Sequence, residues 1–271
     1  MKKSLRYRST VTDARRIVIK LGTGVLTHKN GRPDIRSMRN LVSQIAKVKD
    51  SGYEIVVVTS GAIGTGMEAL GMKTRPTELP DLQMAAAVGQ ARLMSRYEAL
   101  FARYGYKVGQ VLLTHMDFHH KIRLSNIRRT MANLLRHNVI PIVNENDVVA
   151  DEEIKADLAL GDNDLLAALL VRLIRADLLI LLTTTDGLRA PAGNHQTRRI
   201  PYIEKITPAT FSLVRPDKGK LSKGGMASKL KAAQSASSAG CATVIANGRK
   251  PNVLKRILAG EDEGTLILAG V

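Results

Sequence analysis

The sequence predicts an α/β protein with a mainly parallel sheet covered by helices, and two observations carry this prediction. Short apolar segments of strand length alternate with longer segments of helical periodicity, which is typical of strand-helix-strand crossovers. The chain is 44% hydrophobic but only 3% aromatic and has no Trp, so its core must consist of Val, Ile, Leu, Ala and Met. Such a core is usual for parallel strands buried on both faces. With 271 residues, the chain can form one large domain or two lobes that share a sheet.

The first 14 residues are predicted to form a basic N-terminal tail that is disordered or weakly attached. The opening MKKSLRYRSTVTDARR carries six basic residues and one acid, but no apolar region follows, so it does not match a signal peptide. No uninterrupted apolar run approaches the roughly eighteen residues of a membrane span. The single cysteine, Cys241, fits a reducing compartment, and its small neighbours predict a packed thiol. We therefore expect a cytoplasmic protein.

The first predicted strand ends in a lysine and two glycines. The segment RRIVIKLGTGVL is apolar as far as Lys20 and then turns at Gly22 and Gly24. A lysine at such a turn can direct its ammonium group at a bound phosphate while backbone N–H groups surround the oxygens. The spacing is not that of a P-loop, in which Gly-Lys-Ser/Thr opens a helix. An ordinary lysine at the end of a strand fits the pattern equally well.

A second glycine-rich turn follows the next strand. Apolar residues at three- and four-residue steps predict a helix from Asp34 to Ser51, which Gly52 ends, and YEIVVVT predicts a strand from Tyr53 to Thr59. The strand gives way to the small-residue sequence SGAIGTG, which places backbone donors at a helix start, where anions are favoured. The spacing is not that of GxGxxG. We predict an anion-binding turn with Ser60 as its hydroxyl.

The middle of the chain contains the most unusual stretch. A helix from Leu82 to Tyr104, a strand from Gly109 to Leu113 and a basic helix from Ser125 to His137 lead to a buried strand that begins near Val139. Eight of the chain's 24 acids then fall between Asn144 and Asp164, although the formal net charge is +17. Like charges so close together disfavour one another's ionised forms, so a cationic group should lie among them. The interleaved Asn residues favour a receptor for an amine and a metal over a solvated acidic loop.

The crossover pattern brings separate segments to one place. An apolar helix over LLAALLVRLI precedes a strand from Leu178 to Thr183. Ligands of open parallel sheets lie beyond the carboxyl ends of the strands. Because Lys20, Ser60, Asn144 and Thr183 all occupy those ends, we expect them to converge on one crevice.

The last third of the chain is basic. The segment from Arg189 to Lys218 is predicted to be a surface excursion, and two glycines and a lysine then open a helix from Met226 to Ala239, which favours phosphate. Strands are predicted from Ala242 to Ala246 and from Thr265 to Leu268. Between Arg189 and Gly260 there are 14 Lys/Arg and two acids. This charge suits either a nucleotide or a nucleic acid, although stacking aromatics are not interleaved with the basic residues.

Taken in order, seven motifs resemble glutamate 5-kinases of the amino-acid kinase superfamily. They are IVIKLGTGVLT, VVTSGAIGTGMEALG, AAVGQARLM, IPIVNENDVV, GDND, LLILLTTTDGL and GGMASKLKAA, and they cover about residues 16–268. The resemblance implies a three-layer αβα sandwich with an open, mainly parallel sheet. It implies a single kinase domain over residues 15–271, with an acceptor lobe over about 15–176 and a nucleotide lobe over about 177–271.

The resemblance also implies the activity and the residues of the site. The family transfers the γ-phosphoryl group of ATP to the side-chain carboxylate of glutamate, the first step of proline synthesis, with Mg²⁺. The matching catalytic residues are Lys20, Lys229 and Asp164, with Asp164 holding the two lysines. The matching acceptor residues are Ser60, Gly61, Ala62, Asp147, Asp162 and Asn163. The matching nucleotide residues are Lys20, Gly22, Thr183, Thr184, Gly224, Gly225, Met226, Ala227, Ser228 and Lys229. No metal-ligating residue is assigned.

The implied partners are glutamate, ATP, further copies of the chain in a dimer or tetramer, and the downstream glutamyl-phosphate reductase. Several features depart from the family's pattern: Ser222-Lys223 replaces Gly-Thr at the nucleotide turn, Thr184 replaces an Asp, and the linker through residues 156–160 is longer. Many members also carry a C-terminal PUA domain. Two alternatives therefore stay open, a related kinase for another small acid and a catalytically weakened basic protein that regulates a partner or binds nucleic acid.

Overall fold

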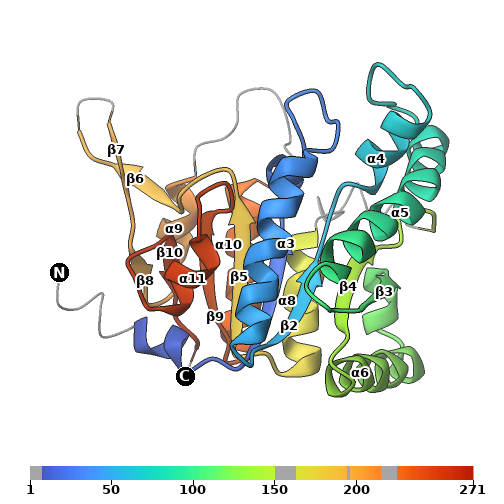
Figure 1. Cartoon of the computed structure of the whole chain (residues 1–271). Coiled ribbons are helices and arrows are strands. Elements are labelled where there is room, and N and C mark those ends of the chain that lie inside the picture. The colour runs from blue at the N-terminus through green and yellow to red at the C-terminus, as the bar shows by residue number, and fades with distance from the viewer. Residues whose placement is uncertain (1–7, 150–162, 194–195, 215–224, 271) are drawn as a thin grey trace.

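An eight-stranded sheet forms the centre of the molecule, as the computed structural model shows (Figure 1). The structure describes residues 8–149, 163–193, 196–214 and 225–270. The strand order is β3-β4-β2-β1-β5-β9-β10-β8, and neighbouring strands are parallel except β9 and β10. The strands are β1 (Arg16–Leu21), β2 (Glu54–Val58), β3 (Val108–Leu113), β4 (Ile140–Glu145), β5 (Leu178–Thr183), β8 (Tyr202–Ile203), β9 (Ala242–Asn247) and β10 (Thr265–Ile267). The predicted fold class, an α/β sandwich with a mainly parallel sheet, is confirmed.

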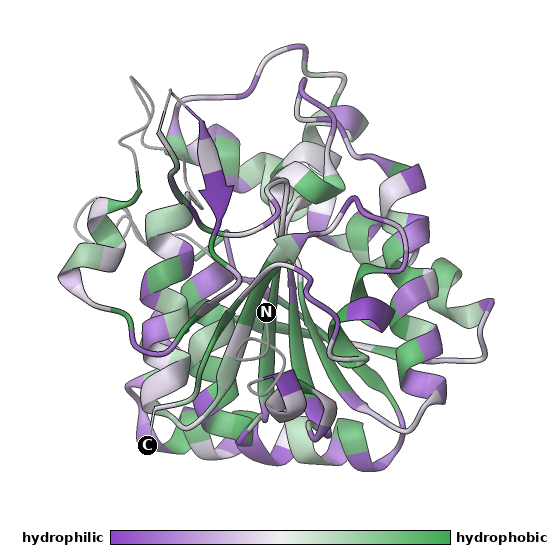
Figure 2. Cartoon of the chain, turned by 90° about the vertical axis from the view of Figure 1, so that its left-hand side faces the viewer, coloured by the Kyte–Doolittle hydropathy of each residue, from purple (hydrophilic) through white to green (hydrophobic). Residues whose placement is uncertain are grey.

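Helices cover both faces of this sheet, so its central strands are buried on both sides (Figures 1 and 2). The front layer in Figure 1 contains α3 (Ile35–Asp50), α5 (Leu79–Ala102) and α11 (Val253–Leu258). The opposite layer contains α6 (Lys121–Arg136), α8 (Asn163–Ile174) and α10 (Met226–Ser238). Shorter helical segments are α2 (Thr23–Leu26), α4 (Ala62–Ala69), α9 (Pro208–Ser212) and a 3-10 turn at His115–Phe118. Figure 2 shows mostly apolar strands between helices that contain both polar and apolar residues.

The alternation of side chains along β1 determines the face of the sheet on which Lys20 lies. Ile17, Ile19 and Leu21 pack in the core on the side of α3, α5 and α11, whereas Val18 packs on the side of α8 and α10. Because side chains alternate along a strand, Lys20 lies on the same face as Val18. The central strand of the sheet therefore delivers an ammonium group to the α8 and α10 layer.

Helix boundaries follow local chemistry that periodicity alone does not reveal. The side chain of Asp34 caps α3 by accepting a hydrogen bond from the Ser37 N–H at 2.9 Å. Helix α5 begins at Leu79 rather than Leu82, because Pro80 is accommodated in its first turn. Helix α6 begins at Lys121 rather than Ser125, since His120 caps it through the Arg123 N–H.

The predicted surface excursion from Arg189 contains regular structure. Strands β6 (Arg189–Pro191) and β7 (Thr197–Arg199) form an antiparallel hairpin, and β8 then joins the main sheet beside β10. These strands are two or three residues long, which is too short to leave a periodic pattern in the sequence. The prediction of a surface excursion did not include these strands.

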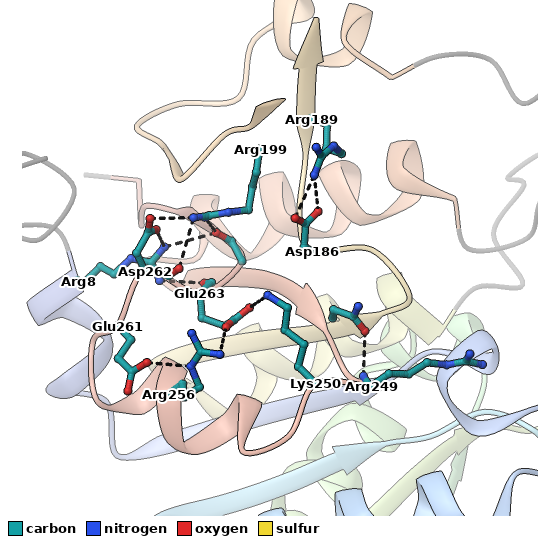
Figure 3. A network of polar contacts seen from close by, with 12 residues as sticks. Arg8, Asp186, Arg189, Arg199, Arg249, Lys250, Arg256, Glu261, Asp262 and Glu263 are labelled. Atoms are coloured by element: carbon teal, nitrogen blue, oxygen red, sulfur yellow. Dashed lines mark hydrogen bonds and ion pairs between the residues drawn. The ribbon is translucent and has the colours of Figure 1, made fainter. Parts of the chain in front are cut away.

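The end of the N-terminal tail is attached to the domain, contrary to the sequence-based expectation. Residues 8–12 are helical, and Val11 and Ala14 are buried in the core. The guanidinium group of buried Arg8 donates to the Glu263 carbonyl at 2.9 Å and to Asp262 Oδ1 at 3.0 Å (Figure 3). A basic side chain that looked like part of a solvated tail is thus a buried anchor.

Two further expectations concern single features. Cys241 is fully buried, and burial raises the pKa of its thiol to about 12, as predicted for a packed residue. Within the described ranges, no helix has the length and apolarity needed to cross a membrane.

Candidate functional site

Two lysines meet over one carboxylate where three elements converge. The Lys20 Nζ at the end of β1 lies 2.6 Å from Asp164 Oδ1, and the Lys229 Nζ in the first turn of α10 lies 2.9 Å from Asp164 Oδ2. Asp164 is 0% exposed, Lys20 2% and Lys229 3%. A buried charge is costly unless it is paired, and here each carboxylate oxygen has its own ammonium partner. The three side chains carry a formal charge of +1, which favours the approach of an anion.

A cavity of about 360 Å³ begins one residue away from this cluster. Asn163 lines the cavity, and Asp164 follows it directly at the start of α8. Five of the six predicted acceptor residues line the same cavity: Ser60, Gly61, Ala62, Asp147 and Asn163. The sixth, Asp162, lies outside the described residues. The structure therefore brings the predicted acceptor residues together from the ends of β2 and β4 and the start of α8.

Asn163 connects these elements through hydrogen bonds. Its amide nitrogen donates to Ser60 Oγ at 3.0 Å and to Asn144 Oδ1 at 3.1 Å, while its oxygen accepts from the Glu145 N–H at 3.2 Å. Asn144 in turn donates to Gln90 Oε1 of α5 at 2.9 Å. An Asn suits this position because it donates and accepts at once. The amides interleaved with the acids therefore build the wall of the cavity.

The glycine-rich turn allows a close approach of backbone to this wall. Gly61 has φ of +105°, a conformation that a side chain would strain, and it precedes the first residue of α4. A Cβ atom at Gly89 of α5 would lie 1.9 Å from the Ala62 carbonyl oxygen, so α4 and α5 are packed backbone to backbone. This contact fixes Ala62, which lines the cavity.

The cavity holds charges of both signs. Glu145 and Asp147 line one part of it, and Arg75 from the segment between α4 and α5 also lines it. Arg75 is exposed and makes no hydrogen bond or ion pair with the residues that the structure describes. A carboxylate and the guanidinium suit the two opposite charges of a zwitterion, and the neighbouring Lys20 and Lys229 suit a further negative group. Sequence analysis missed Arg75, because an isolated Arg before a Pro gives no motif, and it missed the Gln90 contact although AAVGQ was noted.

The predicted nucleotide residues lie at the neighbouring strand ends. The Gly22 N–H donates to the Leu182 carbonyl at 3.0 Å, which places the first turn beside Thr183 at the end of β5. A Cβ atom at Gly24 would lie 3.1 Å from the Thr184 methyl group. Gly225 is the extended N-cap residue of α10, and Met226, Ala227 and Ser228 form the first turn that ends in Lys229. Backbone N–H groups in the first turn of a helix suit phosphate oxygens. Gly224, with Ser222 and Lys223, lies outside the described residues.

The described side chains do not form a ready metal cage. Among residues 8–149, 163–193, 196–214 and 225–270, no three His, Cys, Asp or Glu side chains gather closely enough to hold a metal ion. Asp164 is already paired with two lysines. Magnesium in phosphoryl-transfer sites is usually held by substrate phosphates, waters and one or two carboxylates. The described residues therefore fit magnesium only as an ion that arrives with a nucleotide.

Comparison with known proteins places these features in a family. The family model described as the amino acid kinase family matches residues 15–247. A glutamate 5-kinase from Moorella thermoacetica is 45% identical over 263 residues, which are 96% of this chain and 68% of that protein. A glutamate 5-kinase from Clostridium acetobutylicum is 44% identical over 97% of both chains.

Solved structures show the same fold at low sequence identity. A carbamate kinase from Giardia lamblia bound to AMP-PNP superimposes with a TM-score of 0.62 at 16% identity, covering 95% of this chain and 99% of that one. A UMP kinase from Bacillus anthracis superimposes with a TM-score of 0.59 at 15% identity, covering 95% of this chain and 97% of the other.

Proposed function

Because the chain belongs to the amino acid kinase family, we propose that it catalyses the ATP-dependent phosphorylation of the side-chain carboxylate of L-glutamate, the reaction that begins proline synthesis. One observation carries the proposal at the level of residues. Lys20 and Lys229 flank a single buried carboxylate beside a cavity lined by groups that suit an amino acid.

The reaction needs positioning more than it needs acid-base chemistry. A glutamate carboxylate, with an ordinary pKa of about 4.3, is already ionised at neutral pH and can attack directly. One of its oxygens forms a bond to the γ-phosphorus of ATP, the bond from that phosphorus to the β,γ-bridging oxygen breaks, and ADP leaves with the electron pair. No proton has to be removed from the nucleophile.

The two lysines would supply the electrostatic part of catalysis. Negative charge is spread over the oxygens of the phosphoryl group in flight, and cations fixed around it lower the barrier. Asp164 would act as a positioning residue, because it holds both ammonium groups before the substrates bind. Magnesium, bound with the ATP phosphates, would neutralise further charge. The first turn of α10 and the Gly22 turn would hold those phosphates.

Charges in the cavity would orient the acceptor. Asp147 would pair with the α-ammonium group of glutamate, and Arg75 with its α-carboxylate, so that the side-chain carboxylate extends toward Asn163 and the lysines. The Ser60 hydroxyl, which accepts a hydrogen bond from Asn163 and keeps its own hydrogen, would donate to an acceptor oxygen, and Asn163 would hold Ser60 in place. A substrate fixed at three points can be held in line with the phosphoryl group, which contributes much of the rate enhancement.

The direct test is trapping of the acyl phosphate. Purified protein is incubated with magnesium, ATP, hydroxylamine and one acid from a panel that includes L-glutamate, D-glutamate, L-aspartate, glutarate and 4-aminobutyrate. We expect γ-glutamyl hydroxamate and ADP in equal amounts from L-glutamate, and much less hydroxamate from the other acids. A preference for another acid would replace glutamate as the acceptor, and the absence of hydroxamate from every acid would overturn the proposal. A homo-oligomeric state, a reductase partner and a cytoplasmic location stay predictions.

A further inference from the structure

A second, larger cavity lies between α3 and α11, away from the acceptor cavity. Its volume is about 620 Å³, and it shares no lining residue with the acceptor cavity. The two helices lie side by side in front of the sheet in Figure 1. Lys47 and Val48 of α3 line it from one side, and Lys255 and Leu258 of α11 from the other. Nothing in the proposed phosphoryl transfer uses this space.

The lining of this cavity is cationic. Lys47 and Lys255 are exposed, and the ammonium group of neither forms a hydrogen bond or ion pair with a residue in the described part of the chain. Among its described lining residues there is no Asp or Glu. Two ammonium groups without a carboxylate beside them raise the local positive potential, and a concave surface concentrates it.

Hydrogen-bonding and apolar groups complete the lining. Gln44 is 5% exposed, and its Oε1 accepts a hydrogen bond from the Leu254 N–H at 3.2 Å. Its Nε2 is buried and has no hydrogen-bond partner within the described residues, which is unusual for a buried amide. The partly buried ring of Tyr53 and the side chains of Val48 and Leu258 supply apolar surface.

From this lining we propose that the cavity between α3 and α11 binds a small organic anion, with a phosphate or carboxylate head held by Lys47 and Lys255 and an apolar body against Val48, Tyr53 and Leu258. The mixture of a few polar groups with apolar walls is typical of small-molecule sites, and the volume lies in their usual range. A hydrated inorganic anion would use the lysines but not the apolar part.

Binding in this cavity would also affect the turn after β1, which contains Gly24 and Val25 and borders the acceptor cavity. The Ser37 hydroxyl of α3 donates to the Val25 carbonyl at 2.7 Å, and Arg249, shortly before α11, donates to the Gly24 carbonyl at 2.7 Å. Gly24 and Val25 follow Lys20 by a few residues, and Thr23 and Thr27 of the same turn line the acceptor cavity. A ligand that changes the spacing of the two helices therefore acts on two adjacent carbonyl groups of this turn.

The binding test uses a reporter that the chain itself makes possible. The sequence has no Trp, so Tyr53→Trp places the chain's only Trp in the cavity wall, where its fluorescence can be excited selectively. Phenyl phosphate, which joins a phosphate head to an apolar ring, is titrated while glutamate and a non-hydrolysable ATP analogue fill the active site. We expect a saturable fluorescence change, with inorganic phosphate binding more weakly.

Matched charge variants separate a site from general attraction to a basic chain. In the Tyr53→Trp background, K47Q/K255Q should weaken phenyl phosphate binding by at least about tenfold, which corresponds to about 1.4 kcal/mol. The control K121Q/K205Q removes the same charge from exposed positions elsewhere and should change the affinity less than about twofold. Absence of a saturable signal, or equal weakening by both double variants, would overturn the site.

The effect of the cavity between α3 and α11 on the acceptor cavity is measured separately. Saturating phenyl phosphate should change the KM for glutamate of the parent but not of K47Q/K255Q, if the substrate reaction proceeds as proposed. Saturable binding without any change in KM would overturn the coupling and leave the site standing. Failure of the glutamate reaction would leave the fluorescence test valid, because that test does not depend on turnover.

Discussion

Asp164 is the residue through which the candidate site is held together. Its carboxylate is completely buried between Lys20 and Lys229, which come from β1 and α10. Removing one partner of a buried ion pair typically costs about 3–5 kcal/mol, because the remaining charge is left without compensation. Here the site without Asp164 would contain two buried ammonium groups facing each other. Its position is therefore both a structural and an electrostatic requirement.

Arg75 gives the most specific prediction at the scale of residues. In Arg75→Gln the α-carboxylate of glutamate would lose a charged hydrogen bond worth about 1.5–3 kcal/mol. The KM for glutamate should therefore rise by about tenfold or more, with little change in kcat. Steady-state kinetics with varied glutamate measure this. Lys73→Gln, which removes the same charge from the same exposed segment, should leave KM nearly unchanged.

A substrate analogue provides the control for the role of Arg75. Because 4-aminobutyrate lacks the α-carboxylate, it should inhibit the parent and Arg75→Gln with the same constant. An equal loss of affinity for glutamate and 4-aminobutyrate would show that Arg75 shapes the cavity rather than binding that carboxylate.

The sequence could place a site residue when that residue lay at the end of a predicted strand. Lys20, Ser60 and Asn144 could be placed together, because parallel strands bring their carboxyl ends to one edge. Asn163 and Lys229 were assigned through family motifs. The Arg75 and Gln90 positions depend on how the segment after α4 and the face of α5 return to that edge, which no local pattern encodes.

At the scale of elements, the packing of α4 on α5 positions the acceptor wall. A Cβ atom at Gly89 would lie 1.9 Å from the Ala62 carbonyl oxygen and 2.4 Å from the Gly66 nitrogen, and these are backbone atoms that cannot swing away. Such overpacking typically costs about 1–3 kcal/mol. Because Ala62 lines the acceptor cavity, its displacement should also reach the substrate.

We therefore expect Gly89→Ala to lower the free energy of unfolding and to raise the KM for glutamate together. Urea unfolding and steady-state kinetics measure the two effects. Ser95→Ala, at an exposed position of the same helix, should alter neither by more than about 0.5 kcal/mol. A Gly89→Ala protein with the parent's stability and KM would show that α4 can move without consequence.

Elements of ordinary length could be predicted, and very short ones could not. Strands such as β5 and helices such as α3 contain enough residues for a periodic apolar pattern. Strand β8 has two residues, and its place in the sheet is set by hydrogen bonds to β10, which lies far along the chain. Such pairing is a tertiary effect and leaves no local signal.

At the scale of the whole molecule, the two ends of the described chain are fastened to each other. Arg8 and Arg199 both contact Asp262, and Arg8 also donates to the backbone near β10 (Figure 3). Burial by itself would raise the pKa of Asp262, but the hydrogen bond and charge of Arg199, followed by those of Arg8, lower it overall. The ionised form is therefore the one that stabilises the fold.

This arrangement predicts a defined pH dependence. The depressed pKa in the folded state means that Asp262 stabilises the protein fully above its ordinary value of 3.8 and loses this contribution as the pH falls through the folded pKa. The stability difference between the parent and Asp262→Asn should thus be constant from about pH 7 to 5 and shrink below about pH 4. Because Asp262 is half-exposed, we expect at most about 1 kcal/mol.

Urea unfolding at several pH values measures this difference. Glu98→Gln, an exposed acid on α5, should follow the parent at each pH. A difference that grows on acidification would contradict the assignment of Asp262. The same network explains why composition misjudged the N-terminal tail, because six basic residues indicate solvation unless a distant acid such as Asp262 is known to lie beside one of them.

The central claim is that phosphoryl transfer takes place between Lys20 and Lys229, and the rate of γ-glutamyl hydroxamate formation in single-lysine variants tests it most directly. We expect Lys20→Ala and Lys229→Ala each to lower kcat by at least about 100-fold while cooperative thermal unfolding is retained. Lys231→Ala, at an exposed position two residues further along α10, should keep the parent's rate. A folded Lys20→Ala or Lys229→Ala protein with the parent's kcat would contradict the account.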